Sequence, residues 1–245
     1  MEYKTLNNGV KMPVVGFGVF QVKDEEECKR VVLDAIDAGY RLIDTAQSYG
    51  NEEAVGKAIQ ETNVPREELF ITSKLWVQDM RTYEDAKQGI DNSLQKSGLE
   101  YFDLYLLHQA IGDYFAAWRA MEDAFREGKL KAIGVSNFYP NILTNFCEIV
   151  DIKPMVNQVE LHPYFTQEQA LETMNYYGVI AEAWAPLGGG RYNPFEDEML
   201  ISIANKYQKT VGQVLLRWNI QRGVVVIPKT THIERMIENI DVFDF

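Results

Sequence analysis

Polar and ionisable residues interrupt several apolar runs of the chain at their C-terminal ends. Asp44 and Lys74 stand near the ends of two consecutive runs. A charged side chain buried in an apolar strand is costly unless it is paired, so these two residues are expected to form an ion pair. Such a pair could be purely structural, and by itself it does not establish a reactive site.

Tyr49 follows Asp44 in the turn Gln47-Ser48-Tyr49-Gly50 and can fold back toward that pair. A lone tyrosine in a loop most often only packs, so its interest depends on its neighbours. A lysine ammonium about 4 Å away stabilises a phenolate by up to about 4 kcal/mol. We therefore expect Lys74 to lower the pKa of Tyr49 toward the range useful for general acid catalysis. His108 could then hydrogen-bond a substrate carbonyl oxygen and orient it.

Short β-rich apolar runs alternate with longer amphipathic stretches from residue 14 onward, a pattern that predicts parallel strands joined by crossover helices. Apolar residues three and four apart favour helices at Phe115–Phe125 and Val211–Trp218. A chain of 245 residues has the usual size of a closed barrel, so we predict a (β/α)8 TIM barrel forming a single domain over residues 1–245. The expected strands are Val14–Val19, Arg41–Thr45, Leu69–Leu75, Phe102–His108, Ala132–Ser136, Met155–Leu161, Val179–Trp184 and Val224–Pro228.

Two segments outside these repeats carry turn signals. Asn8-Gly9 lies between β-compatible flanks and predicts an N-terminal β-hairpin that closes the bottom of the barrel. Gly188-Gly189-Gly190, followed by Asn193-Pro194, predicts a flexible loop after the seventh strand. Loops at that end of a barrel usually carry function.

The composition excludes several kinds of partner. A formal net charge of -12 disfavours nucleic acid and anionic membranes, since both are polyanions. No apolar run reaches the roughly 18 residues of a membrane helix, and the first residues do not resemble a signal peptide. We expect a cytoplasmic, monomeric protein that acts on a small molecule.

The sequence does not indicate a metal site. Cys28 and Cys147 have no metal-type spacing, and Cys28 begins an apolar helix face on which burial is expected. His162 and His232 are interpreted as a rim or structural residue and a helix-entry residue. Neither cysteine is expected to be catalytic.

A nucleotide would have to bind without the usual glycine-rich fingerprint, because Gly16-Phe17-Gly18 is followed by Gln21 where a third glycine is needed. Barrels commonly bind phosphate at the loops after strands seven and eight and at a helix N-terminus. Lys229 and Arg235 flank hydroxyl residues at that place and suit a phosphate monoester. An ordinary capped helix with solvated charges is the alternative.

Three segments resemble signature sequences of the aldo-keto reductase family, and together they are highly specific. They are Gly39-Tyr40-Arg41-Leu42-Ile43-Asp44-Thr45-Ala46, Gly134-Val135-Ser136-Asn137-Phe138 and Ile227-Pro228-Lys229-Thr230. The resemblance runs in order from the N-terminal hairpin to the last residue. It implies a catalytic tetrad in which Tyr49 is the acid, Lys74 supported by Asp44 modifies its pKa, and His108 orients the substrate.

The resemblance also implies NADPH as the cofactor. It assigns the 2'-phosphate of the cofactor to Lys229, Thr230 and Arg235, and the adenine to Glu238 and Asn239.

The same resemblance places the nicotinamide against strand ends in the second half of the barrel. It assigns the amide of the ring to Ser136, Asn137 and Gln158. Trp184 is similar to the family's aromatic residue that stacks on the nicotinamide.

The implied reaction is NADPH-dependent reduction of a small aldehyde or ketone. Resemblance to bacterial glyoxal and diketogluconate reductases favours a dicarbonyl or keto-sugar substrate. A barrel that binds NADPH as a regulatory sensor with little turnover is the alternative, against which the intact tetrad counts.

The chain departs from the family pattern at three places. Ala110 and Ala185 replace the usual Pro and Ser, which changes the shape of the pocket more than its chemistry. The chain ends at Phe245, where relatives usually continue through a further helix and a tail over the substrate pocket. We expect this tail to be missing or truncated.

Phe20 and Trp76 are expected pocket walls, and Trp118 is expected to pack in the core.

Overall fold

Eight parallel strands form a closed barrel in the computed structural model, which describes residues 2–245. Neighbouring strands follow chain order, and the first and last are joined by a bridge between Val15 and Val226. Gly18 N also donates to Pro228 O at 3.1 Å across this seam. The strands are β3 (Gly16–Gly18), β4 (Leu42–Asp44), β5 (Phe70–Leu75), β6 (Leu104–Leu107), β7 (Ile133–Ser136), β8 (Val156–Glu160), β9 (Ile180–Trp184) and β10 (Val225–Val226).

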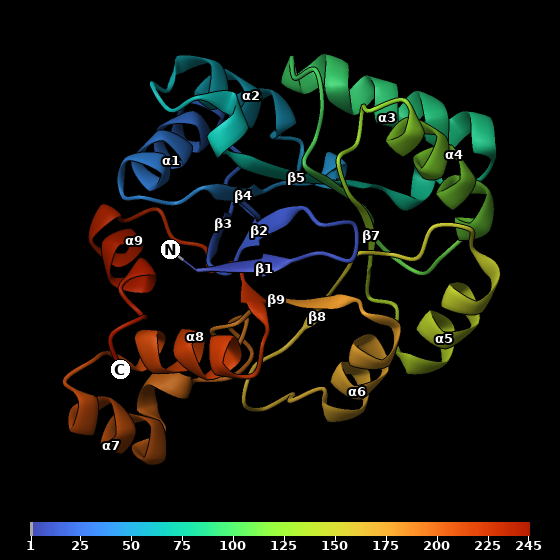
Figure 1. The fold of residues 1–245 in the computed structure, drawn as a ribbon. Helices are drawn as coiled ribbons and strands as arrows, with labels where there is room; N and C mark the ends of the chain where they lie inside the picture. The colour runs from blue at the N-terminus through green and yellow to red at the C-terminus, as the bar shows by residue number, and fades with distance from the viewer. Residues whose placement is uncertain (1) are drawn as a thin grey trace.

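Helices surround the barrel, as Figure 1 shows. They are α1 (Glu25–Asp37), α2 (Glu52–Glu61), α3 (Tyr83–Ser97), α4 (Tyr114–Arg126), α5 (Pro140–Ile149), α6 (Glu168–Tyr177), α7 (Glu198–Tyr207), α8 (Val211–Gln221) and α9 (Ile233–Ile240). Short 3-10 turns lie at η1 (Gln47–Tyr49), η2 (Arg66–Glu68), η3 (Val77–Asp79) and η4 (Pro194–Glu196).

The predicted (β/α)8 barrel is confirmed. Several strands are shorter than predicted, and helix α7 was not anticipated. None of the helices within residues 2–245 is both long and apolar enough to cross a membrane.

Side-chain caps begin several helices where the sequence supplies Asp or Thr. Asp24 accepts from Glu27 N at 2.8 Å and starts α1, whose buried face includes Cys28 as expected. Asp113 accepts from Ala116 N at 2.9 Å and starts α4. Each cap satisfies a backbone N–H that would otherwise lack a partner, which determines where the helix begins.

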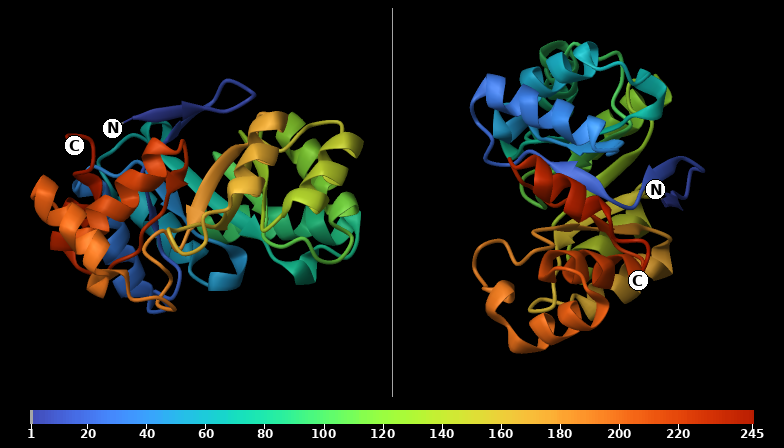
Figure 2. Two further views of the ribbon diagram at one scale, coloured as in Figure 1. Left: turned by 90° about the horizontal axis from the view of Figure 1, so that it is seen from below. Right: turned by 90° about the vertical axis from the view of Figure 1, so that its left-hand side faces the viewer.

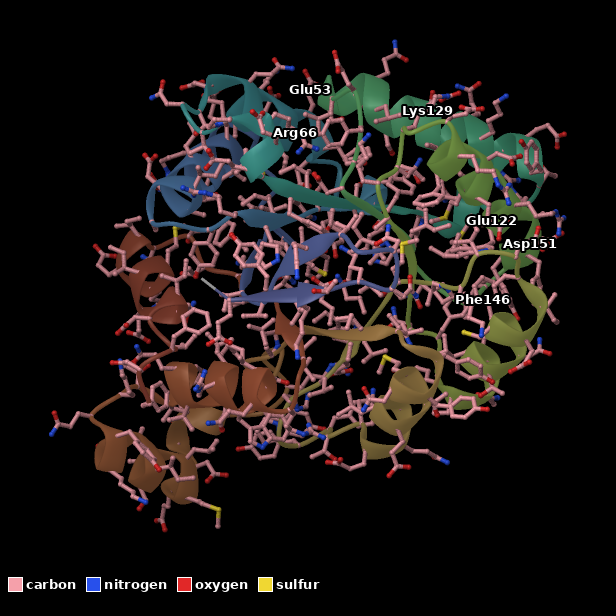
Figure 3. All side chains as sticks on the ribbon, viewed as in Figure 1. Glu53, Arg66, Glu122, Lys129, Phe146 and Asp151 are labelled. Atoms are coloured by element: carbon pink, nitrogen blue, oxygen red, sulfur yellow. The ribbon has the colours of Figure 1, made fainter. Side chains whose placement is uncertain are left out.

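An aromatic cluster joins α4 and α5 to the barrel wall. Phe146, labelled in Figure 3, lies with its ring 5.0 Å from those of Trp118 and Phe138. Trp118 is buried, and its indole N–H donates to Ile152 O at 3.0 Å. The expected packing role of Trp118 is therefore confirmed.

The predicted N-terminal hairpin is also confirmed, with β1 (Tyr3–Thr5) pairing antiparallel with β2 (Lys11–Pro13). Its turn side chains Asn7 and Asn8 donate to backbone oxygens of Pro154 and Lys131, which lie just before β8 and β7. The hairpin thus covers the N-terminal ends of the strands, at one end of the molecule in Figure 2. The opposite end stays open for a site.

Close packing of α2 on the C-terminal end of α3 depends on a missing side chain at Gly56. A Cβ there would collide with the backbone carbonyl of Ser97. Gly56→Ala is therefore expected to destabilise the protein by about 1–3 kcal/mol, since backbone must move. Chemical denaturation measures the change.

Gly212 in α8 provides the matched control, because a Cβ there meets its nearest neighbour at an ordinary 3.6 Å. Gly212→Ala should be neutral or stabilising by up to about 1 kcal/mol through helix propensity. Equal effects of the two substitutions would contradict the packing argument.

Candidate active site

The C-terminal ends of the strands and the loops after them line a cleft of about 780 Å³. Its polar wall combines residues from successive strand ends, and its aromatic wall includes the expected Phe20 and Trp76. Parallel strands place their C-terminal ends at one side of a barrel, which explains why residues distant in sequence meet here. The polar residues of the wall include Asp44, Ser48, Tyr49, His108, Ser136, Asn137, Gln158 and Lys229.

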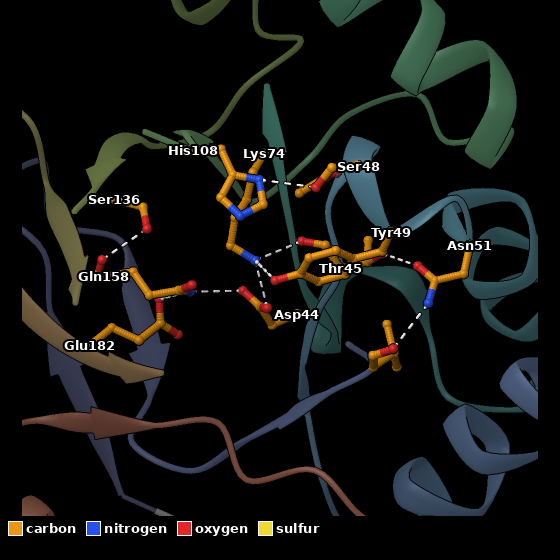
Figure 4. A network of polar contacts seen from close by, with 12 residues as sticks. Asp44, Thr45, Ser48, Tyr49, Asn51, Lys74, His108, Ser136, Gln158 and Glu182 are labelled. Atoms are coloured by element: carbon orange, nitrogen blue, oxygen red, sulfur yellow. Dashed lines mark hydrogen bonds and ion pairs between the residues drawn. The ribbon is translucent and has the colours of Figure 1, made fainter. Parts of the chain in front are cut away.

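The predicted ion pair between Lys74 and Asp44 is present, as Figure 4 shows, and Asp44 belongs to the lining of the cleft. Lys74 Nζ donates to Asp44 Oδ1 at 2.6 Å and to Thr45 O at 2.8 Å. Both charged side chains are almost completely buried. A buried ammonium is tolerated only with such partners, so the pair holds β4 and β5 in one arrangement.

Tyr49 reaches the ion pair from η1, with its hydroxyl 3.5 Å from Lys74 Nζ. Gly50 ends this turn in the left-handed conformation, at φ 73°. Asn51 fastens the segment to the barrel, since its amide donates to Val19 O and Val22 O at 3.0 Å. The phenol is thereby held on a rigid support, although η1 itself is a loop element.

The expected lowering of the Tyr49 pKa is not seen in the structure. Burial raises the pKa of Tyr49 above its ordinary value, and Lys74 only opposes this effect. Asp44 and Glu182 raise the pKa further, since their negative charges disfavour a phenolate. Lys74 does lower the pKa of Tyr49 as expected, but burial has the larger effect on it.

His108 follows β6 and lies beside Tyr49 and Trp76, with ring centroids 5.7 Å and 5.0 Å apart. Burial, followed by the charge of Lys74, lowers the pKa of His108 to about 3. The imidazole is therefore neutral near pH 7, with one N–H donor and one acceptor nitrogen. Ser48 Oγ lies 3.4 Å from its Nδ1.

A second polar group adjoins the tetrad at the ends of β7, β8 and β9. Ser136 Oγ donates to Gln158 O at 2.8 Å, and Asn137 Nδ2 donates to His108 O at 3.2 Å. Trp184 Nε1 donates to Asn137 Oδ1 at 2.9 Å. The structure thus brings the four predicted nicotinamide residues together next to His108.

The five predicted adenosine-end residues form a separate group around α9. Lys229 lines the cleft, while Arg235 lies exposed on α9, and neither makes an ion pair within residues 2–245. Thr230 Oγ1 accepts from His232 N at 3.2 Å. Glu238 already accepts from Thr210 Oγ1 at 2.7 Å, and Asn239 is buried. Only Lys229 of this group belongs to the cleft lining.

Glu182 belongs to the site but was not anticipated from the sequence. It lies fully buried on β9, and its Oε2 accepts from Gln158 Nε2 at 2.9 Å. The same amide nitrogen donates to Asp44 Oδ2 at 2.9 Å. Burial, followed by the charge of Asp44, raises the pKa of Glu182 to about 8. An acidic residue two positions before Trp184, inside an apolar run, was the signal that could have revealed it.

The cleft also contains Arg191, from the glycine-rich loop after β9, which the sequence analysis did not single out. Arg191 Nη1 lies 3.3 Å from Glu160 Oε2 at the end of β8. His162, expected at the rim or in a structural role, is fully buried and lies 3.3 Å from the other oxygen of Glu160. The loop after β9 is thus connected to β8 at the edge of the cleft.

Comparison with known proteins finds aldo-keto reductases both by sequence and by structure. Residues 14–245 match the model of the Aldo/keto reductase family. The chain is 48% identical to glyoxal reductase of Bacillus subtilis, covering 98% of this chain and 86% of that protein. It is 41% identical to a methylglyoxal reductase of Escherichia coli, covering 98% and 87%. An aldo-keto reductase of Bombyx mori solved in complex with NADP matches with a TM-score of 0.93 and 38% identity, over 100% of this chain and 88% of that one.

The raised pKa of Glu182 predicts a pH-dependent stability effect. An unfolded glutamic acid ionises near pH 4.5, whereas the folded one keeps its proton until about pH 8. Folding therefore becomes less favourable as pH rises through this window. Glu182→Gln, which cannot ionise, should raise the midpoint of thermal unfolding at pH 8 and change it much less at pH 5. A stability difference that is the same at both pH values would contradict the assignment.

Proposed function

The chain belongs to the aldo/keto reductase family, and from this premise we propose that it reduces small aldehydes and ketones with NADPH, using Tyr49 as the general acid. The observation that carries the proposal is the 3.5 Å contact between Tyr49 Oη and Lys74 Nζ at the floor of an open cleft. A phenol, an ammonium and a neutral imidazole converge there, which suits protonation of a carbonyl oxygen.

The residues present fit the nicotinamide end of the cofactor. Gln158 uses its amide nitrogen for Asp44 and Glu182, and its Oε1 has no hydrogen-bond partner within residues 2–245. That oxygen is suited to accept from the carboxamide of the ring, together with Ser136 and Asn137 beside it. Trp184, partly exposed in the cleft, would pack on the ring face. Bound NADPH supplies the hydride.

The residues at α9 fit the phosphate end. Lys229 and Arg235 are cations without ion-pair partners within the described chain, and the first turn of α9 has no side-chain cap. Free backbone N–H groups and the helix dipole favour an anion at such a terminus. We assign the 2'-phosphate to Lys229, Thr230 and Arg235. Glu238 and Asn239, on the same helix, would contact the adenine.

Four residues of the chain then have separate roles in proton transfer. Tyr49 donates its proton to the carbonyl oxygen, and Lys74 stabilises the phenolate that remains. Asp44 keeps Lys74 charged inside the barrel. His108, neutral because its pKa is lowered to about 3, donates a hydrogen bond that orients the carbonyl. Hydrogen-bond donors that are already in place around the developing alkoxide lower the activation barrier, because they do not have to reorient during the reaction.

The similarity to glyoxal and methylglyoxal reductases supports small dicarbonyls as substrates, with keto-sugars as the second class. Phe20, whose ring centroid lies 4.9 Å from that of Tyr49, and Trp76 would form the apolar side of the pocket. Gln109 and Gln21 in the same lining offer hydrogen bonds to additional oxygens of such substrates.

Removal of the Tyr49 hydroxyl tests the general acid. Tyr49→Phe should lower kcat for methylglyoxal reduction by about 100-fold or more, since general acid catalysis contributes about that factor. NADPH affinity should change little. The assay follows NADPH absorbance with an aldehyde panel, and Tyr176→Phe, a change at an exposed tyrosine on α6, is the control. Equal rates in wild type and Tyr49→Phe would remove Tyr49 from the mechanism, and absence of turnover in the wild type would favour the sensor function.

Removal of the Arg235 side chain tests the phosphate assignment. Arg235→Ala should raise the Kd for NADPH by about 10- to 100-fold, because a charge-assisted hydrogen bond to phosphate is lost. The Kd for NADH should stay nearly constant, since NADH lacks that phosphate. Arg119→Ala, at an exposed arginine on α4 that also makes no ion pair within residues 2–245, is the matched control for a lost surface charge. Equal weakening of both cofactors by Arg235→Ala would contradict the assignment.

A further inference from the structure

Glu182 is a buried acid for which the reduction mechanism has no use. Its side chain is fully buried on β9 and contacts Gln158, a residue of the cleft lining. Gln158 Nε2 donates to its Oε2, while its Oε1 has no hydrogen-bond partner within residues 2–245. A permanently ionised carboxylate would need more donors than this single amide hydrogen bond. The geometry instead suits a carboxyl group that gains and loses a proton.

The charges around Glu182 come from three neighbouring elements. Asp44 on β4 shares the amide of Gln158, and Lys74 on β5 and Tyr49 on η1 are the other titratable groups that interact with it. Strand β10 contributes the apolar Val225, paired in register with Glu182. Lys74 is already matched by Asp44 at 2.6 Å, so an ionised Glu182 is a negative charge in excess. This excess agrees with the raised pKa of Glu182.

Glu182 also lies beside two of the four residues that the proposed function assigns to the nicotinamide, Gln158 and Trp184. It pairs in register with Gln158 on β8. Alternate residues of a strand face the same side, so Glu182 and Trp184 point into the barrel together. A ring held by Gln158 and Trp184 would therefore lie near Glu182, with little water between them to screen a charge.

We propose that Glu182 responds to the charge of the nicotinamide, being ionised when NADP+ is bound and protonated when NADPH is bound. The oxidised ring carries one positive charge, which balances the excess negative charge of an ionised Glu182. The reduced ring is neutral and leaves the proton in place. NADP+ binding thus releases a proton from Glu182 to solvent, and NADPH binding does not. This inference rests on the proposed function.

The proposal predicts the direction in which the affinity for NADP+ changes with pH. NADP+ binds more tightly to the ionised form, so its affinity should rise with pH through the Glu182 titration. For one proton whose pKa shifts by about one unit on binding, the Kd for NADP+ should fall about five- to tenfold between about pH 6.5 and pH 9. The Kd for NADPH should not fall. Lower pH therefore favours the reduced cofactor on the enzyme, which is the form that carbonyl reduction requires.

Two binding measurements with matched variants test the proposal. Kd values for NADP+ and NADPH are measured by quenching of tryptophan fluorescence at both ends of this pH range, for wild type, Glu182→Gln and Glu52→Gln. Glu182→Gln keeps the size of the side chain but cannot ionise, so the difference in pH dependence between the two cofactors should disappear. Glu52 is the control, because it is also buried with a raised pKa but accepts from Ser73. Glu52→Gln should keep the wild-type pH dependence.

Calorimetry on the wild type counts the proton directly and does not depend on how well a variant folds. NADP+ and NADPH are titrated near pH 8 in two buffers of different ionisation enthalpy, and more proton release is expected for NADP+. Equal release for the two cofactors overturns the proposal, as does an unchanged pH dependence in a folded Glu182→Gln. Either result leaves the proposed function intact, since the cofactor still binds. A wild type that binds neither cofactor overturns both.

Discussion

The buried contact between Lys74 and Asp44 constrains the whole site. An ammonium and a carboxylate removed from water are tolerated only when their geometry is fixed, and loss of one partner typically costs 3–5 kcal/mol. The pair requires that β4 and β5 be adjacent and that Thr45 present its carbonyl to Nζ. The same constraint determines where a phenol can meet the ammonium. One interaction therefore positions the groups to which we assign the chemistry.

Stability and chemistry are divided between the two ends of the barrel. At the N-terminal end the hairpin hydrogen-bonds to the loops before β7 and β8 and covers the strand ends there. At the C-terminal end, side chains from successive strand ends meet in the cleft. Segments that follow the strands, such as η1, add further side chains to it, among them Tyr49. Asn51 compensates for the greater freedom of a loop by joining η1 to the segment after β3. Tyr49 thus combines a loop position with the rigidity that its proposed role in proton transfer requires.

Much of this arrangement could be predicted from the sequence, because it follows from periodicity and from charged residues at strand ends. The eight strands, the hairpin and the Lys74–Asp44 pair are of this kind. The direction of the Tyr49 pKa could not be predicted, since it depends on how much water tertiary packing removes and on the acid Glu182. Helix α7 carries apolar residues at helical spacing, such as Met199 and Ile203, but it is an additional helix between β9 and α8, where the strand–helix alternation and the glycine-rich run predicted only a loop.

Glu182 shows why the least predictable residue can matter most for the site's electrostatics. A closed barrel excludes counterions from its interior, so each buried charge must be balanced by another side chain or by a bound ligand. The charges of Asp44 and Lys74 cancel each other. The net charge of the site therefore depends on the protonation of Glu182 and on the charge of the ligand that binds next to it. A neutral residue at this position would make folding easier at neutral pH, yet it would make the site indifferent to that charge. Under the proposed response to cofactor charge, a carboxyl group that is expected to lower stability is understandable at this position.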